Sequence, residues 1–273
     1  MTERDVVVGA HTLHTVDVGD VDGEPMLFLH GTGPGASGFP SFAPMLEGLD
    51  SFRCLVPDLL GFGRSSHPHD VTDGPGSWLE IRVETVRAML DELGIGRVHL
   101  VGHSYGCRVA LELLKMEPDR YGKVVLVAAG GTPVKASLQR LTGFYADPTE
   151  QRMRELVLAQ VARDIQELDA YTMERFELAR RPEVERSFTS AMGPGEPAPV
   201  NDQAVLATIR HEALAVHGRL DPTIHYSASL FLAEHLPHCD LHVFSGASHL
   251  LQLEEPDALA RLVRGFVHAR PTR

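Results

Sequence analysis

Residues 102–106 read Gly-His-Ser-Tyr-Gly and match the pattern G-x-S-x-G, which can present a serine as a nucleophile. An apolar run, 98–101, precedes Ser104 and predicts a short buried strand, and residues 105–117 follow with the spacing of an amphipathic helix. A sharp turn from strand to helix leaves no room for a Cβ two residues before or after the serine, which explains the two glycines of the motif. The helix N-terminus behind the serine favours developing negative charge. The pattern therefore predicts a nucleophile elbow at Ser104.

A serine hydroxyl is a weak nucleophile at neutral pH, so Ser104 needs a base, and the base needs an orienting carboxylate. Asp221 lies in the loop after an apolar strand that begins at residue 213, and His249 lies in the loop after a strand that begins at residue 241. This order, serine, then acid, then histidine, is the one that follows such an elbow. The sequence therefore predicts a triad of Ser104, Asp221 and His249 at one sheet edge. Taken singly, Asp221 could instead cap the next helix and His249 could be an ordinary loop histidine, but the three together favour the triad.

A glycine-rich loop, 30–38, follows a third apolar run and reads His-Gly-Thr-Gly-Pro-Gly-Ala-Ser-Gly. Glycines let a backbone approach a ligand closely and leave amide groups free to point inward. An oxyanion hole needs one amide from such a loop and one from the residue after the nucleophile. We therefore assign the amides of Thr32 and Tyr105 to this hole, with Gly33 beside them. A phosphate-binding loop is the alternative, but no G-K-[ST] follows and the spacing is not G-x-G-x-x-G.

The chain resembles the α/β-hydrolase-fold enzymes over nearly its whole length. Five segments carry the resemblance in the family's order: 30–31, 58–65, 102–106, 217–221 and 246–249. The resemblance implies the α/β-hydrolase fold, which has a mostly parallel central sheet with helices on both faces and an inserted helical lid. It also implies a hydrolase with a serine nucleophile and no cofactor.

Within that fold, the chain is similar to the meta-cleavage-product hydrolases, which split carbon–carbon bonds in 2-hydroxy-6-oxo-dienoates formed by aromatic-ring degradation. The run 33–38, the Leu-His-Val-Phe strand at 241–244 and Glu-Arg-Phe at 174–176 carry this likeness. The resemblance implies that Arg175 is a lid arginine that contacts a substrate carboxylate. The alternative is a salt bridge at the surface or within the lid, because several other arginines lie nearby in the sequence.

Three positions depart from the pattern of that subfamily. His103 stands where Asn usually precedes the nucleophile, Leu250 stands where Trp usually follows the histidine, and Ser41 lies near a usual Asn. All three are expected to line the substrate site, although His103 could also simply pack. Their changed sizes predict more room beside the catalytic histidine and fewer fixed hydrogen-bond donors. These changes favour a bulkier or less polar substrate, such as a polycyclic ketone or lactone.

Strand and helix alternate along most of the chain, which predicts a parallel sheet covered on both faces. The alternation stops over residues 134–205, where helical patterns occur without a convincing strand and helices are expected at 150–162 and 169–180. An all-helical insertion of this kind predicts a lid over the active site. We therefore expect a core domain, 1–133 and 206–273, with the lid between them.

Composition narrows the choice of partners. The 273 residues are 43% hydrophobic and 23% charged, as in an ordinary globular enzyme. A net charge of −12 argues against nucleic acid and against an anionic membrane surface as partners, and no apolar run approaches the ~20 residues that span a bilayer. The start of the chain has no signal-peptide pattern, so a cytoplasmic location is expected. We expect a small-molecule substrate, and a homo-oligomer such as a dimer stays open.

The three widely spaced cysteines, without a C-x-x-C, are typical of free thiols in a reducing compartment. None of the 15 histidines lies with a carboxylate and a second histidine at zinc spacing, so no metal site is predicted. Three functions stay open: hydrolysis of a carbon–carbon bond next to a ketone, hydrolysis of an ester or lactone, and a non-hydrolytic lyase, cyclase or binding role. An intact triad argues against pure binding, and a serine nucleophile excludes dehalogenases and epoxide hydrolases, which use aspartate.

Overall fold

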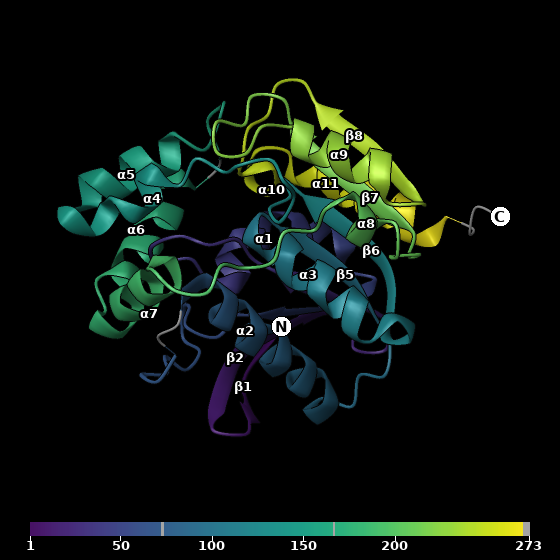
Figure 1. The fold of residues 1–273 in the computed structure, drawn as a ribbon, viewed down its shortest axis with the longest axis horizontal. Helices are drawn as coiled ribbons and strands as arrows, with labels where there is room; N and C mark the ends of the chain where they lie inside the picture. Colours follow the sequence, from purple (N-terminus) through teal and green to yellow (C-terminus); the bar gives the residue numbers. More distant parts are fainter. Residues whose placement is uncertain (72–73, 166, 270–273) are drawn as a thin grey trace.

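The computed structural model describes residues 1–71, 74–165 and 167–269. The strands of its sheet are β1 (Thr2–Val8), β2 (His11–Gly19), β3 (Glu24–Leu29), β4 (Phe52–Pro57), β5 (Val98–His103), β6 (Tyr121–Val127), β7 (Ala213–Gly218) and β8 (Cys239–Phe244). They lie in the order β1-β2-β4-β3-β5-β6-β7-β8 (Figure 1). β2 pairs antiparallel with β1 and β4, and every later pair is parallel. The predicted mostly parallel sheet is confirmed.

Helices cover both faces of this sheet. The α-helices are α1 (Gly38–Leu46), α2 (Gly74–Glu92), α3 (Tyr105–Met116), α4 (Gln139–Thr142), α5 (Glu150–Leu158), α6 (Leu168–Ala179), α7 (Pro182–Met192), α8 (Gln203–Leu206), α9 (Ser227–His235), α10 (Leu251–Glu254) and α11 (Pro256–His268). Three short 3₁₀ helices are η1 (Glu47–Leu49), η2 (Pro118–Arg120) and η3 (Phe144–Ala146). Helices α2, α3 and α9 contribute to the apolar cluster on one face, and α1 and α11 contribute to the cluster on the other.

The central strands are apolar on both sides because both sides are covered. In β5, Leu100 packs into the cluster with α3, and the next residue, Val101, packs into the cluster with α1. Both side chains are fully buried, and each contributes about 1.5–3 kcal/mol of burial free energy. This packing holds the carboxyl ends of β3, β5, β7 and β8 at one sheet edge, and the loops that carry the candidate site follow those ends.

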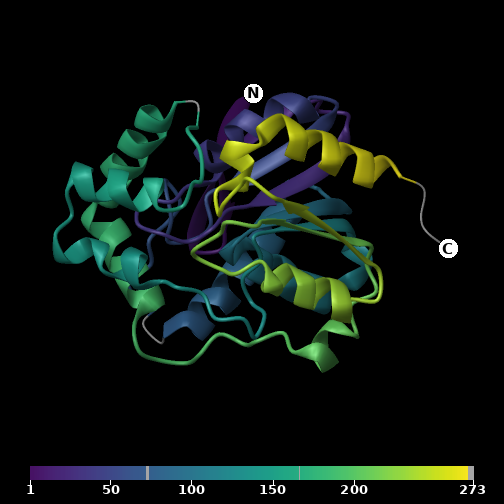
Figure 2. The same cartoon turned by 90° about the horizontal axis from the view of Figure 1, so that it is seen from above.

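Helices α4 to α7 lie together to one side of the sheet, in teal and green at the left of Figures 1 and 2. They fall within residues 134–205, for which we expect a lid, and this segment is called the lid below. Their side chains share an apolar cluster that also includes Leu250, just before α10, and Leu253, within α10. Helix α5 ends at Leu158, four residues before the predicted end. The helix stops there because the following backbone bonds to the histidine loop: the carbonyl of Gln160 accepts the amides of His249 and Leu250, each at 3.1 Å.

Candidate active site

Ser104 lies at the turn between β5 and α3, with φ 52° and ψ −110°. Residues other than glycine rarely adopt this backbone conformation, and such strain is typical of functional positions. The flanking glycines permit the turn. A Cβ at Gly102 would lie 2.8 Å from the amide nitrogen of Cys107, and a Cβ at Gly106 would overlap the carbonyl of Leu29 in β3. The strained turn and its two glycines therefore agree with the elbow expected at Ser104.

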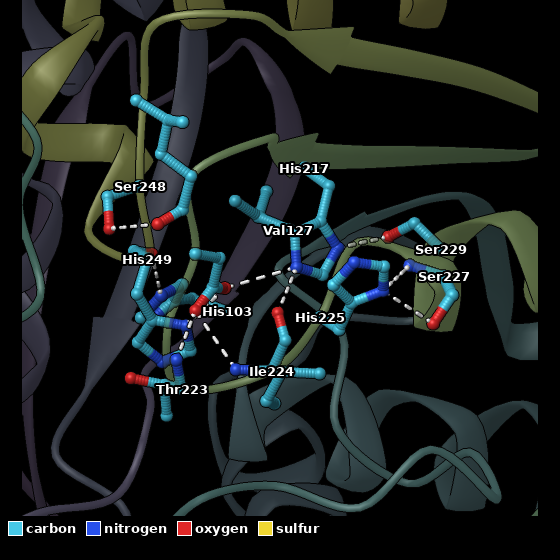
Figure 3. Close-up of polar contacts among 12 residues, drawn as sticks. His103, Val127, His217, Thr223, Ile224, His225, Ser227, Ser229, Ser248 and His249 are labelled. Carbon is cyan, nitrogen blue, oxygen red and sulfur yellow. Dashed lines mark hydrogen bonds and ion pairs between the residues drawn. The ribbon is translucent and has the colours of Figure 1, made fainter.

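Asp221 and His249 are joined by a hydrogen bond of 2.7 Å between Oδ2 and Nδ1, and both side chains are buried. The other carboxylate oxygen of Asp221 accepts the backbone amides of Thr223 and Ile224, at 2.7 and 2.9 Å. Figure 3 shows Thr223 and Ile224 beside His249, with His217 adjacent. The two interpretations of Asp221 are thus not exclusive, because one oxygen caps the local backbone and the other faces the imidazole.

The environment of Asp221 keeps it ionised. Burial alone would raise its pKa, but the nearby His249 and hydrogen bonds from His217, His249 and the Ile224 amide hold the pKa well below the usual value. An ionised carboxylate next to Nδ1 favours the imidazole tautomer with a proton on Nδ1 and a free Nε2. The described residues show no hydrogen bond between the Ser104 hydroxyl and His249, and such contacts often tighten only when substrate is bound.

His217 is a second, fully buried partner of Asp221. Its Nε2 donates to the Asp221 carboxylate at 3.1 Å and to the carbonyl of Ile224 at 2.9 Å, and its Nδ1 accepts from the Ser229 hydroxyl at 2.7 Å. The residue holds the acid in place without reaching the reacting atoms. Its only signal in the sequence is its place four residues before Asp221, which the family motif does not interpret.

His103, the residue before the nucleophile, uses its Nε2 proton to bond the carbonyl of His249 at 2.9 Å. The centroids of the two rings lie 5.0 Å apart, and Figure 3 shows the two side chains next to each other. Burial first, and the neighbouring His249 second, lower the pKa of His103 to about 3. His103 is therefore a neutral side chain that lines the site while its single donor positions the histidine loop.

The glycine-rich loop makes room for the lid as well as for a ligand. A Cβ at Gly33 would overlap the guanidinium of Arg175, and a Cβ at Gly35, which has φ +64°, would overlap the carbonyl oxygen of Arg175. In the described part of the chain, the amides of Thr32 and Tyr105 donate to no backbone acceptor. The Tyr105 amide belongs to the first residue of α3, where helical amides have no partner within the helix.

Arg175 lies on α6 and points into the core rather than to solvent, since only 5% of its surface is exposed. Its Nε donates to the carbonyl of Pro34 at 3.0 Å. Among the residues that the structure describes, no carboxylate forms an ion pair with it. Within the described residues, Arg175 thus lies neither at the surface nor in a salt bridge, which argues against the alternative considered above. A buried guanidinium without an acidic partner is unfavourable unless an anion can reach it.

A cavity of about 20 Å³ lies beside His249, between the core and the lid. The core lines it with Thr32, Ser41, His103, His249, Leu250 and Gln252, and the lid lines it with Gln160, Tyr171 and Arg175. Leu250 lines this cavity and packs into the apolar cluster of the lid, and the space that is left would hold about one water molecule. The extra room expected beside the histidine stays a prediction.

The expected shortage of fixed donors also stays a prediction. Ser41 is committed elsewhere, since its hydroxyl donates to the carbonyl of Ser37 at 2.6 Å. However, Thr32, Gln160 and Gln252 each present buried polar atoms that have no hydrogen-bond partner among the described residues. Sequence reasoning missed the two glutamines, since neither belongs to a catalytic motif and only the fold brings them together.

A second cavity of about 210 Å³ lies on the other side of Gln160. Its wall is partly apolar, with Leu141 and Leu156 from the lid and Pro222 and Thr223 from the loop after Asp221. Gln160 lines both cavities, so they lie next to each other.

Within residues 1–71, 74–165 and 167–269, no group of three His, Cys, Asp or Glu side chains is arranged to hold a metal ion. No helix in those ranges is long and apolar enough to cross a membrane. The three cysteines are free thiols, and burial raises the pKa of Cys54 to about 12. The lack of a cofactor, the cytoplasmic location and the oligomeric state stay predictions.

Residues 26–262 match the alpha/beta hydrolase family. A 2-hydroxymuconate semialdehyde hydrolase of Pseudomonas putida is 32% identical over 97% of this chain and 93% of its own. A 2-hydroxy-6-oxononadienedioate/2-hydroxy-6-oxononatrienedioate hydrolase of Escherichia coli K12 is 30% identical over 95% of this chain and 91% of its own. The solved structure of a 2-hydroxy-6-oxo-6-phenylhexa-2,4-dienoate hydrolase from Rhodococcus sp. strain RHA1 superimposes with a TM-score of 0.89 and 32% identity, covering 98% of this chain and 99% of that one. The chain therefore belongs to the alpha/beta hydrolase family and is an enzyme of the hydrolase class.

Proposed function

We propose that this hydrolase cleaves the carbon–carbon bond next to the ketone of a 2-hydroxy-6-oxo-dienoate, with Ser104, His249 and Asp221 as its catalytic triad. The observation that carries the proposal is that His249 lines the same cavity as Arg175, whose buried guanidinium has no acidic partner among the described residues. The similar enzymes from Pseudomonas putida and Rhodococcus are named for substrates of this class, which supports the proposal.

The first half of the reaction forms a tetrahedral adduct on Ser104. Moving the proton of the C2 hydroxyl to C5 gives the keto tautomer of the substrate, in which C5 is saturated. The Ser104 hydroxyl then adds to the C6 carbonyl while His249 Nε2 takes its proton, and ionised Asp221 stabilises the imidazolium. The amides of Thr32 and Tyr105, with Gly33 beside them, receive the negative oxygen that forms on C6.

The second half releases both products. When the C5–C6 bond breaks, the electron pair passes through C4 and C3 onto the C2 oxygen, which then takes a proton from His249. This gives 2-hydroxypenta-2,4-dienoate and leaves the acyl group on Ser104. Water, deprotonated by His249, hydrolyses the acyl ester and releases a carboxylic acid.

Charge and space decide how the substrate lies. Arg175 pairs with the C1 carboxylate, which supplies the anion that its buried guanidinium lacks. Ser41, His103 and Leu250 complete the wall around this end. The cavity of about 20 Å³ is too small for a dienoate, so the lid, 134–205, shifts on the core to admit it. The group beyond C6 then occupies the larger cavity of about 210 Å³.

A comparison of two substrates with the same acyl group tests the proposal. The first is 2-hydroxy-6-oxo-6-phenylhexa-2,4-dienoate, and the second is a phenyl ester of benzoic acid. We expect a higher kcat/KM for the dienoate, with benzoate and 2-hydroxypenta-2,4-dienoate formed one to one. Hydrolysis of the ester with the dienoate left intact would instead assign the protein to the carboxylesterases. Loss of the dienoate without benzoate would point to a lyase or cyclase.

A further inference from the structure

Gln252 lies on α10, three residues after His249, and its side chain is fully buried. It lines the same cavity as His249 and Arg175. Neither Oε1 nor Nε2 of its amide has a hydrogen-bond partner among the described residues. An amide that loses its hydrogen bonds to water on folding and gains none destabilises the folded protein. Such a loss is expected where the group serves a ligand.

Polar atoms without a hydrogen-bond partner are concentrated around the cavity that Gln252 lines. Thr32 Oγ1 and Gln160 Oε1 face the same cavity and also lack partners in the described chain. Gln252 differs from both, because it is the one described side chain with two buried unpaired atoms, a donor and an acceptor. A ligand that satisfies Gln252 must therefore offer an acceptor and a donor next to each other.

Arg175 cannot distinguish a carboxylate that has a neighbouring hydroxyl from one that has none. A guanidinium carries donors alone, so Arg175 would accept a carboxylate whatever its neighbouring group. A 2-hydroxy-2-enoate carries a hydroxyl donor on C2 beside the carboxylate acceptor on C1, which is the arrangement that a primary amide complements. The two side chains together would read both groups at this end of the substrate.

We propose that Gln252 is a specificity-determining residue that recognises the C2 hydroxyl beside the substrate carboxylate. Its Oε1 accepts a hydrogen bond from the hydroxyl, and its Nε2 donates a hydrogen bond to the carboxylate that Arg175 also binds. The inference rests on the proposed function and adds a requirement for the 2-hydroxyl. It also gives this chain a polar contact in a site where Ser41 and Leu250 lie in place of the Asn and Trp that the subfamily usually has.

Binding to a catalytically inactive background measures recognition apart from chemistry. In Ser104→Ala protein, the Kd of the phenyl dienoate is compared with that of the same dienoate lacking the 2-hydroxyl. We expect the hydroxylated compound to bind about 100-fold more tightly, because a site built to bond a hydroxyl rejects the analogue without it. Adding Gln252→Met should bring the two Kd values within about threefold by weakening the hydroxylated compound. Leu253→Met, which puts the same side chain at the next position of α10, should leave the 100-fold preference.

The outcomes separate the inference from the function on which it rests. If the Ser104→Ala protein binds neither dienoate, the proposed function is wrong and the inference falls with it. If it binds the hydroxylated dienoate but Gln252→Met keeps the preference, the function stands and the inference is wrong. A Gln252→Glu variant should bind the dienoate more weakly than Gln252→Met, because the new carboxylate would occupy Arg175.

Thermal unfolding of the free enzyme gives an independent readout. Since the Gln252 amide has no partner in the described chain, Gln252→Met removes a destabilising group, and we expect Tm to rise by about 2–4 °C. A fall in Tm of several degrees would show that the amide supports the fold. That result would overturn its assignment to substrate.

Discussion

The two walls of the active site are built in different ways. The core wall is held by tight turns and short hydrogen bonds, with Ser104 in a strained conformation and Asp221 bonded to His249, His217 and its own loop. The lid wall presents Gln160, Tyr171 and Arg175 from segments that depend on apolar packing in a separate cluster. Under the proposed function, the core wall supplies the reacting groups, and substrate recognition uses Arg175 from the lid wall together with Gln252 from the core wall.

The two walls meet at the histidine loop. The carboxylate of Glu254 accepts the amide of Ser248 from the core with one oxygen and the amide of Ala162 from the lid with the other, each at 2.6 Å. The carbonyl of Gln160 accepts the amides of His249 and Leu250 at the same junction. The position of His249 is thus coupled to the position of the lid.

Loss of a core-wall group should have the largest effect. Ser104→Ala or His249→Ala should lower kcat on any substrate by about 10⁴-fold or more, because the members of a triad act as a unit. A serine-directed fluorophosphonate should label wild-type protein and not Ser104→Ala. Ser227→Ala, whose hydroxyl meets only His225 in the described chain, serves as the control and should be labelled normally. Undiminished labelling of Ser104→Ala would falsify the nucleophile assignment.

A change at the contact between the walls should act on one substrate more than another. Gly35→Ala places a Cβ against the backbone of Arg175, so we expect α6 to move away and kcat/KM for the dienoate to fall by about 100-fold, with a smaller loss for a neutral ester. Stability should fall by about 2–3 kcal/mol.

Gly94→Ala is the matched control for Gly35→Ala. Gly94 has φ +66°, close to that of Gly35, but a Cβ there would meet nothing within 4 Å. It should lose about 1–2 kcal/mol from backbone strain alone and keep its activity. Equal loss of activity in the two variants would remove the argument that the glycine loop accommodates the lid.

Glu254→Gln should weaken the link between the walls. An amide nitrogen cannot accept a hydrogen bond, so either Ser248 or Ala162 loses its partner, and unfolding should become easier by about 1–3 kcal/mol. We expect kcat/KM for the dienoate to fall by about tenfold through misplacement of His249. A change in stability with unaltered kinetics would show that the link supports the fold without positioning the histidine.

The smallest effect concerns pH and the core wall. Burial first, with nearby cationic groups second, lowers the pKa of His103 to about 3 and of His30 to about 4, from the usual 6.5. Between about pH 6.5 and 4, the unfolded chain binds protons that the folded protein does not. The free energy of unfolding should therefore fall with decreasing pH by about 1.4 kcal/mol per unit for each histidine. His103→Asn should remove one such contribution in urea titrations at pH 7.5, 6 and 5, and an unchanged slope would contradict the neutral state of His103.

The core wall could be predicted because each of its reactive side chains lies in a local sequence pattern. The elbow at Ser104 and the loops of Asp221 and His249 each combine a strand, a turn and one reactive side chain, and parallel pairing then brings the strand ends together. The mostly parallel pairing of the sheet follows from the alternation of strand and helix. The burial of the central strands follows as well, since strands that are apolar on both sides must be covered on both faces.

The contact between core and lid could not be predicted in the same way. Leu250 packs against the lid, and the cavity beside it is small. Gln160 and Gln252 reach one cavity from segments about ninety residues apart, through packing that no local pattern encodes. Helix α5 ended early for the same reason, since its backbone found partners in a distant loop.

The role of Arg175 in substrate recognition is tested most directly by the Kd of the phenyl dienoate for Ser104→Ala and for Ser104→Ala with Arg175→Gln. We expect the single variant to bind the dienoate. The second change should weaken binding by about 30-fold or more, since it removes a buried charge-assisted pair. The methyl ester of the same dienoate, which lacks the anion, should bind both variants within about threefold. Equal Kd values of the dienoate for the two variants would contradict the account, because Arg175 would then not be the group that selects the substrate.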